Sequence, residues 1–463
     1  MAMSTVILAA GLGTRMKSAT PKVLHMLLGR PVVRHVVDTA KAMRPEKIIV
    51  VVSPAGSGVQ DALKDSSVSF AVQKTPKGTA DALMAAVREL GNFNGTLLVL
   101  SGDAPLVGLS TLRRLLTAHK RRKEDISILS FIAEGNHSYG RVVRNSSRVT
   151  AIVENRDADS TQKKIREVNS GIYALEPSAL ALLKDIKINP RKKEFYLTDL
   201  ISIASSRGLR IGSHIFGDET ELTGINTRAE LSLAGLYLRD RTIAGWLERG
   251  VSFIDAKSVF IDPRARIGMD TIIYPNVIIE GKSIIGPGCI IYPNSRITDS
   301  RLGNNVTIKD SSVIESSTVK EGAAIGPFAH LRPGSVIGKS AKIGNFVEIK
   351  KSSIGRNSKA SHLSYIGDAE IGENVNIGAG TITCNYDGLN KFRTVIEDGS
   401  FIGSDTQLVA PVKVGKGAYV GSGTTVTRDV PPMALALSRT PQLNIEGWAL
   451  RRSAEKEKKK TKK

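Results

Sequence analysis

A six-residue spacing of aliphatic residues runs through the second half of the chain and restricts its fold more than any other feature. Three series keep this spacing: Ile267, Ile273, Ile279, Ile285, Ile291 and Ile297; Val319, Ile325, Leu331, Ile337, Ile343 and Ile349; and Ile396, Ile402, Leu408, Val414, Val420 and Val426. Six residues of an α-helix turn through about 240°, so these side chains would point in three directions and form no apolar stripe. The spacing therefore excludes a helix.

The same spacing is typical of a parallel β-helix built from short strands. Each six-residue unit supplies one side of a triangular coil, and the recurring aliphatic side chain points into the prism. Glycine beside the aliphatic position, as at Gly326 and Gly421, accepts the backbone angles that a corner needs. A rigid oligomerisation scaffold would show the same spacing, so the repeat alone does not establish an activity.

This pattern resembles that of the hexapeptide-repeat acyltransferases over nearly the whole second half of the chain. The resemblance implies a left-handed parallel β-helix that assembles as a trimer, and we expect this domain at residues 251–440. Carbonic anhydrases and several regulatory domains share the prism. The chemistry must therefore come from residues that interrupt the repeat.

The first half of the chain alternates predicted strands and helices. Buried strands are indicated at Thr5–Ala9, Lys47–Ser53 and Thr96–Leu100, with a helix at Gly78–Leu90. This alternation predicts a mainly parallel α/β sheet whose ligands bind beyond the carboxyl ends of the strands. Because 463 residues exceed what one hydrophobic core usually serves, we expect two or three domains.

A loop of small residues follows the first predicted strand and leads to a basic residue. It reads LAAGLGTRM from Leu8 to Met16, and Lys22 follows. Phosphate can approach backbone N–H groups where side chains are absent, and Arg15 and Lys22 supply positive charge for a triphosphate. The loop is not a dinucleotide fingerprint, because Met16 stands where a third glycine belongs, and it is not a Walker loop.

A carboxylate follows the third predicted strand, in the string from Gly102 to Leu106 (GDAPL). At the carboxyl end of a strand and beside a phosphate loop, Asp103 suits Mg²⁺, a hard cation that keeps waters and needs only one or two protein oxygens. Without the preceding loop, an aspartate that caps the next helix would be the simpler interpretation.

Both strings, together with Pro21-Lys22, resemble the signature of sugar-nucleotide pyrophosphorylases. The two halves in this order resemble the family of bifunctional uridylyltransferases and acetyltransferases that makes UDP-N-acetylglucosamine, over essentially the whole chain. The resemblance also rests on Gln73, Pro76-Lys77-Gly78-Thr79, Tyr139-Gly140-Arg141, Glu154, Asp157, Asn169-Ser170-Gly171 and Gly224-Ile225-Asn226. It implies an α/β Rossmann-like nucleotidyltransferase domain at 1–226, a connecting helix at 227–250 and the left-handed β-helix.

The resemblance implies that the first domain binds UTP, a sugar phosphate and Mg²⁺, with Asp103 and Asn226 as metal ligands. Arg15 and Lys22 would stabilise the charge that develops towards pyrophosphate. The implied nucleotide and sugar site consists of Leu8, Ala9, Ala10, Gly11, Lys22, Gln73, Gly78, Thr79, Ser101, Gly102, Asp103, Gly140, Glu154, Asn169 and Asn226. Gln73, Gly78 and Thr79 would contact the uracil, and Gly140, Glu154 and Asn169 the sugar. The sequence departs from the family pattern at Leu12, Ser101 and Ser170.

The resemblance implies acetyl transfer from acetyl-CoA to glucosamine 1-phosphate in the second domain. His362 would be the general base that takes a proton from the amine. The implied sugar-phosphate site contains Arg332, Lys350, Tyr365 and Asn376, and the implied acetyl-CoA site contains Ala379, Asn385, Tyr386, Ser404, Ser422 and Arg439. Asn385 and Tyr386 belong to an exposed segment where the repeat is interrupted. The alternatives are a pyrophosphorylase for another sugar nucleotide with a regulatory β-helix, or an inactive scaffold.

The net charge of +21 raises the question of nucleic-acid binding. The only dense basic run is Arg451 to Lys463, which contains no aromatic residue for base stacking. We therefore expect no specific nucleic-acid partner, and a C-terminal segment at 441–463 with a disordered basic tail. No stretch approaches the roughly 20 apolar residues of a membrane span, which predicts a cytoplasmic enzyme.

Overall fold

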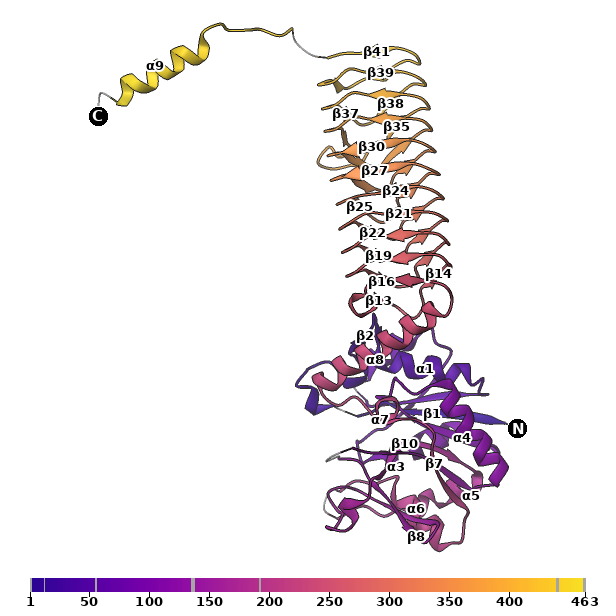
Figure 1. Cartoon of the computed structure of the whole chain (residues 1–463). Helices are drawn as coiled ribbons and strands as arrows, with labels where there is room; N and C mark the ends of the chain where they lie inside the picture. The colour runs from indigo at the N-terminus through magenta and orange to yellow at the C-terminus, as the bar shows by residue number, and fades with distance from the viewer. Residues whose placement is uncertain are drawn as a thin grey trace. The chain divides into compact units, whose positions relative to one another are not determined.

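The chain folds as two compact units, Met1–Thr242 and Ile243–Lys463, in a computed structural model (Figure 1). The model describes residues 2–11, 13–54, 56–134, 138–190, 193–438 and 441–460. Helix α8 spans Arg228–Leu247, and the division between the units falls inside it. The sequence prediction placed one connecting helix at 227–250. In the structure, Ile243 and Trp246 belong to the hydrophobic core of the second unit.

The first unit is built on one twisted sheet with helices on both faces. Its main strands are β1 (Met3–Leu8), β4 (Ile48–Val52), β5 (Ser69–Val72), β6 (Thr96–Ser101), β7 (Ile126–Ile132), β10 (Glu167–Leu175) and β11 (Ile211–Ile215). They lie in the order β11-β7-β10-β6-β1-β4-β5, where β10 is antiparallel to both neighbours and the other pairs are parallel. The mainly parallel sheet that the sequence predicts is confirmed.

Short elements complete this unit. A hairpin of β8 (Arg141–Asn145) and β9 (Arg148–Val153) pairs with β10, and β2 (Met26–Leu27) pairs with β3 (Arg30–Pro31). The helices are α1 (Val32–Ala42), α2 (Ser57–Leu63), α3 (Thr79–Leu90), α4 (Leu109–Arg122), α5 (Pro177–Leu180), α6 (Asp199–Ser206) and α7 (Glu219–Leu222), with 3-10 turns at Thr14–Met16, Lys22–Leu24, Gln162–Lys164 and Ala181–Asp185.

Alternate residues of the central strands feed two separate cores. Val6 and Val99 pack with α3 and α6 on one face, whereas Ile7 and Leu100 pack with α1 and α4 on the other. Successive side chains of a strand point to opposite faces, and burial on both faces explains why these strands are continuously apolar. Polar side chains that bind a ligand must therefore lie in the loops that follow these strands rather than within the strands.

The second unit has three parallel sheets whose strands come in rotation along the chain. Side 1 contains β12 (Ser252–Phe253), β15 (Ile272–Ile273), β18 (Ile290–Ile291), β21 (Thr307–Ile308), β24 (Ala324–Ile325), β27 (Lys342–Asn345), β30 (Lys359–His362), β33 (Asn376–Ile377), β36 (Phe401–Ile402), β39 (Tyr419–Val420) and β41 (Leu435–Ala436). Side 2 contains β13 (Phe260–Ile261), β16 (Ile278–Glu280), β19 (Arg296–Thr298), β22 (Val313–Glu315), β25 (His330–Leu331), β28 (Glu348–Lys350), β31 (Tyr365–Gly367), β34 (Ile382–Cys384), β37 (Gln407–Val409) and β40 (Thr425–Val426). Side 3 contains β14 (Arg266–Ile267), β17 (Ile284–Ile285), β20 (Arg301–Leu302), β23 (Thr318–Val319), β26 (Val336–Ile337), β29 (Ser353–Ile354), β32 (Ala369–Ile371), β35 (Thr394–Ile396) and β38 (Val412–Val414).

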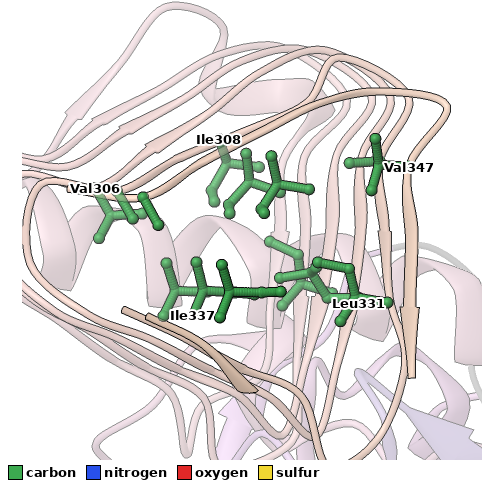
Figure 2. Packing of buried hydrophobic residues seen from close by; sticks show 14 of the residues in the cluster. Val306, Ile308, Leu331, Ile337 and Val347 are labelled. Carbon is green, nitrogen blue, oxygen red and sulfur yellow. The ribbon is translucent and has the colours of Figure 1, made fainter. Parts of the chain in front are cut away.

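The residues of the six-residue series fill the interior of this prism. Every member of the three series is buried, and the most accessible of them, Ile267, is 7% exposed. Figure 2 shows Val306 and Ile308, Leu331 and Ile337 converging on one interior from different sides of the coil. The parallel β-helix that the spacing predicts is confirmed.

Two neighbouring isoleucines provide a matched test of this packing. Ile279 is fully buried, whereas Ile278 points outwards and is 38% exposed. We expect Ile279→Ala to lower the free energy of unfolding by about 2–5 kcal/mol, because it leaves a cavity in the core. Ile278→Ala should cost less than about 1 kcal/mol. Both tryptophans, Trp246 and Trp448, lie in the second unit, so their fluorescence during urea unfolding follows this unit. Equal losses from both variants would contradict the inward packing.

The structure differs from the sequence prediction at the C-terminus. Helix α9 spans Trp448–Lys460, where we predicted a disordered basic tail. Ala, Glu, Lys and Arg dominate this segment and have high helix propensity, and Arg452 pairs with Glu455 one turn later at 3.5 Å. Its side chains are exposed as far as Glu457, so propensity accounts for this helix rather than burial. Within the described residues, no helix combines the length and apolar character needed to cross a membrane.

Candidate functional site

A cavity of about 740 Å³ opens at the carboxyl ends of β1 and β6. Leu8 and Ser101 are register partners at the ends of these parallel strands, so the loops that follow them begin side by side. The cavity is lined by the predicted residues Leu8, Ala9, Ala10, Gly11, Lys22, Gln73, Gly78, Thr79, Ser101, Asp103, Glu154 and Asn169. The structure thus brings together residues that are spread over more than half of the first unit.

The other predicted residues of the first unit adjoin this cavity. Gly102 N–H donates to the Leu8 carbonyl at 2.9 Å, and Asn169 N–H donates to the Gly140 carbonyl at 2.9 Å. Arg15 Nη2 donates to Asn226 Oδ1 at 2.8 Å. Leu12, one of the three positions where the sequence departs from the family pattern, lies outside the described residues.

Two oxygens converge on one cationic group at the edge of the cavity. Lys22 Nζ contacts Asp103 Oδ2 and lies 3.0 Å from Asn226 Oδ1. The Ile225 N–H donates to the Asp103 carbonyl at 2.8 Å, which holds Asn226 against the end of β6. The predicted ligand pair therefore forms a position that already attracts a cation.

This donor set suits a cation that keeps most of its own ligands. Among the residues that the structure describes, no group of three or more His, Cys, Asp and Glu side chains could hold a metal. A carboxylate and an amide oxygen leave the other positions to water and phosphate oxygens, which is how Mg²⁺ binds at nucleotide sites. The residues fit a nucleotide-bound divalent ion.

Gln73 and Thr79, which line the same cavity, have groups that can recognise a pyrimidine. Gln73 is 5% exposed, and its Nε2 donates to the Gly78 carbonyl at 3.0 Å and to Asp81 Oδ2 at 2.9 Å. Because both amide hydrogens are used, Oε1 is the group left for a ligand N–H. Thr79 Oγ1 accepts from the Leu197 N–H at 3.0 Å, which connects this loop to a segment that the sequence did not indicate.

Glycine is required at position 78, where the loop before α3 meets the segment that contains Phe195 and Leu197. Its φ is 105°, and a Cβ would lie 2.5 Å from the Phe195 carbonyl oxygen. We expect Gly78→Ala to reduce kcat/KM for UTP by about tenfold or more, because the strain of about 1–3 kcal/mol must move one segment away. Pyrophosphate release measures this effect. Gly245→Ala is the control, since a Cβ there meets nothing within 4 Å. Wild-type kcat/KM for Gly78→Ala would contradict this packing.

A buried carboxylate, Glu154, also lines the cavity. Burial raises the pKa of Glu154, and a hydrogen bond from Thr198 Oγ1 at 3.0 Å partly offsets this effect. Asn169 Nδ2 donates to the Tyr173 hydroxyl at 2.6 Å, and burial also raises the pKa of Tyr173. These groups can accept hydrogen bonds from sugar hydroxyls. Sequence reasoning missed Tyr173 and Thr198, which belong to no motif and reach the site only through the fold.

A cationic group forms on side 2 of the β-helix. Arg332 Nη1 donates to Glu348 Oε1 at 2.9 Å. The nearby amine of Lys391, with a smaller effect of Arg332, lowers the pKa of Lys350. These cations concentrate positive charge on one side of the coil, and a phosphate could bind to it. Lys391 comes from the loop that interrupts the repeat, and sequence reasoning missed it.

Tyr365 and Asn385 meet above a glycine on the same side. A Cβ on Gly367 would lie 2.5 Å from the Tyr365 hydroxyl and 2.9 Å from Asn385 Nδ2. Asn385 is only 7% exposed, because it donates to Asp368 Oδ2, so the predicted exposed segment is wrong at this residue. Tyr386 is 59% exposed, as expected.

Another group of predicted residues follows one column of consecutive coils on side 1. Asn345 pairs with His362, and the register of β30, β33, β36 and β39 continues this column to Ala379, Ser404 and Ser422. Backbone hydrogen bonds agree: Asp405 N–H donates to the Ala379 carbonyl at 2.7 Å, and Gly423 N–H to the Ser404 carbonyl at 2.8 Å. The implied general base and the implied acetyl-CoA contacts therefore lie in line.

One predicted residue of the second unit, Asn376, lies neither in the cationic group of side 2 nor in the column of His362. Asn376 begins β33 on side 1, where it pairs with Lys359, whereas Lys350 and Tyr365 lie on side 2. Arg439 lies outside the described residues. Within one chain, Asn376 therefore faces a different side of the prism from the cationic group.

Two family models match the chain, one in each unit. Residues 5–170 match the MobA-like NTP transferase domain. Residues 264–299, 316–351 and 393–428 match the bacterial transferase hexapeptide with six repeats. The first matched segment contains most of the residues that line the cavity, and the other segments contain much of the prism.

Several relatives match the chain over nearly its whole length. The bifunctional protein GlmU of Thermodesulfovibrio yellowstonii is 52% identical over 448 residues, which are 96% of this chain and 99% of the relative. Proteins of the same name from Syntrophotalea carbinolica and Geotalea uraniireducens are 47% and 45% identical, each over 97% of this chain and over 97% and 99% of their own lengths. Similarity at this level extends through both units.

Proposed function

The chain belongs to the GlmU family of bifunctional proteins, and from that premise we propose how its two units divide the synthesis of UDP-N-acetylglucosamine. It is a bifunctional enzyme with acetyltransferase and uridylyltransferase activities. Acetyl-CoA acetylates glucosamine 1-phosphate, and the product then reacts with UTP and releases pyrophosphate. The observation that carries this function is the similarity to these relatives across both units.

We assign uridylyl transfer to the cavity of the first unit. The sugar phosphate attacks the α-phosphorus of UTP, a reaction that needs positioning and charge neutralisation rather than a protein nucleophile. Gln73 Oε1 would accept from the uracil N–H, and the small residues after β1 would let the triphosphate approach the backbone. Glu154 and Asn169 would orient the sugar.

The family implies a divalent metal, and we propose Mg²⁺ on Asp103 and Asn226. When bound, Mg²⁺ neutralises charge on the phosphates. Lys22 now contacts both ligands, so with nucleotide present its ammonium group would turn to the phosphate oxygens. Arg15, which contacts Asn226, would do the same.

We assign acetyl transfer to the β-helix. Arg332, Lys350 and Lys391 would bind the sugar phosphate, and Tyr365 with Asn385 would lie beside the sugar. His362 would take a proton from the glucosamine amine, whose nitrogen then attacks the thioester carbonyl. The column from Ala379 to Ser422 would hold the acetyl-CoA arm.

We also propose that the enzyme is a homotrimer. Asn376 faces a different side of the prism from Lys350 and Tyr365, so a complete site needs a second chain that places its Asn376 opposite them. The molar mass in solution, measured by light scattering, tests this proposal. A monomer with full acetyltransferase activity would contradict it.

One experiment tests the proposed function as a whole. Purified protein is incubated with glucosamine 1-phosphate, acetyl-CoA, UTP and Mg²⁺, and free thiol and pyrophosphate are followed together. We expect thiol release first, then pyrophosphate, and no pyrophosphate when acetyl-CoA is omitted. Pyrophosphate release without any thiol release would instead support a pyrophosphorylase for another sugar nucleotide with a regulatory β-helix. Release of neither product would support a scaffold.

A further inference from the structure

We infer that Asn345 is a positioning residue for acetyl transfer, because its side-chain oxygen holds His362 in the tautomer whose Nε2 can accept a proton. This inference rests on the proposed role of His362 as the general base. It adds a residue that neither the repeat nor the family resemblance indicated.

The hydrogen bond between the two side chains determines the tautomer. His362 Nδ1 lies 2.7 Å from Asn345 Oδ1. An amide oxygen only accepts hydrogen bonds, so Nδ1 must carry the proton and donate. A neutral imidazole has one N–H, which leaves the lone pair on Nε2. Because the two nitrogens lie on different edges of the ring, this bond also turns Nε2 away from Asn345.

The two strands that carry Asn345 and His362 are longer than the other strands of side 1. The described strands of side 1 contain two residues each, except β27 and β30, which contain four. The additional residues bring Asn345 into register with His362. A Cβ on Gly344 would lie 1.9 Å from the Ser361 carbonyl oxygen, so the close approach of these strands requires glycine at 344. The Leu363 N–H donates to the Asn345 carbonyl at 3.0 Å and fixes the backbone of the pair.

The place of Asn345 in the column fits this role. It occupies the coil before His362, whereas Ala379, Ser404 and Ser422 occupy the coils after it. The proposed acetyl-CoA arm therefore lies on one side of the imidazole and Asn345 on the other. Asn345 can hold the ring without occupying the space of the thioester.

The acceptor that Asn345 offers to His362 is a neutral amide rather than a carboxylate. A carboxylate at this position would also accept from Nδ1, but it would favour the charged imidazolium and raise the pKa of the ring. The amide orients the ring without placing a negative charge beside it. This difference provides the test.

Two variants of similar shape separate the acceptor from the packing. Asn345→Leu removes the acceptor, and Asn345→Asp keeps it but adds charge. For Asn345→Leu we expect kcat for acetyl transfer to fall on the order of 10–100-fold, as for other groups that orient a functional histidine, with KM for both substrates nearly unchanged. For Asn345→Asp we expect substantial activity at high pH and an acid limb of kcat/KM shifted upwards by about one pH unit. Uridylyl transfer by the same samples should stay at the wild-type rate and shows that the protein is folded.

Nitrogen-15 NMR of histidine-labelled protein measures the tautomer directly. We expect the wild-type His362 signals, assigned by their loss in His362→Ala, to show a protonated Nδ1, and Asn345→Leu to show a mixture of tautomers. Wild-type kcat in Asn345→Leu, an unshifted acid limb in Asn345→Asp, or a protonated Nε2 in the wild type would each overturn the inference while leaving the role of His362 intact. If His362→Ala itself keeps acetyl transfer, the proposed function of this site fails instead.

Discussion

Replacing Asp103 with alanine is expected to reduce uridylyl transfer on the order of a thousandfold and to leave acetyl transfer at the wild-type rate. Asp103 supplies one of the two oxygens that converge on Lys22 at the end of β6. Without it, the proposed metal keeps only Asn226 as a protein ligand, and the position loses its negative charge. The loss of one preorganised electrostatic group in such a site typically costs two to three orders of magnitude.

The measurement is pyrophosphate release from UTP and N-acetylglucosamine 1-phosphate, with thiol release from acetyl-CoA recorded on the same sample. Raising the Mg²⁺ concentration should restore part of the activity of Asp103→Asn, because an amide oxygen is a weaker ligand, but little of the activity of Asp103→Ala. Asp61→Ala, an exposed position in α2, is the control for removing a carboxylate from this unit. Uridylyl transfer that survives Asp103→Ala would show that the metal has other ligands.

The second large effect is expected on the other reaction, acetyl transfer. His362→Ala should reduce acetyl transfer by about 10²- to 10⁴-fold, the range attributed to a general base, while uridylyl transfer continues. The imidazole ends β30, is exposed, and is followed in its column by Ala379, Ser404 and Ser422. Among the described residues, the cores of the first unit contain only residues of that unit, so we expect this change to leave the first unit folded.

Another outward-facing histidine of the β-helix provides the control. His330 pairs with Glu315 at 3.1 Å on side 2, so His330→Ala removes an imidazole from the same prism outside the proposed column. We expect it to keep acetyl transfer. If either Asp103→Ala or His362→Ala abolished both reactions, the assignment of one reaction to each unit would be wrong.

The β-helix could be predicted almost completely from the sequence because one physical rule governs every coil. Each coil has three inward positions, and an aliphatic residue at each of them produces the six-residue spacing. Ile279 and Leu408, more than a hundred residues apart, obey the same rule. The C-terminal helix α9 has no such rule, because it forms through the helix propensity of Ala, Glu, Lys and Arg and, as far as Glu457, buries no apolar face.

The nucleotide cavity could be predicted in part, for a different reason. Residues such as Asp103 directly follow apolar strands, and parallel strands end at one edge, so their proximity follows from the topology. Thr198, Tyr173 and Lys391 have no such signal, because a loop or another strand carries each of them to its site. Asn345 resembles an ordinary corner asparagine until the strand register places it beside His362.

The regular rise of the prism has a consequence for which acyl donors it accepts. Three steps along the column separate His362 from Ser422, and at about 4.8 Å per step this is about 14 Å. A rigid stack cannot change that length, so in the proposed site the number of coils fixes the distance between a thioester at His362 and a contact at Ser422. An acyl donor with a shortened pantetheine chain would still place its carbonyl at His362 but would no longer reach Ser422.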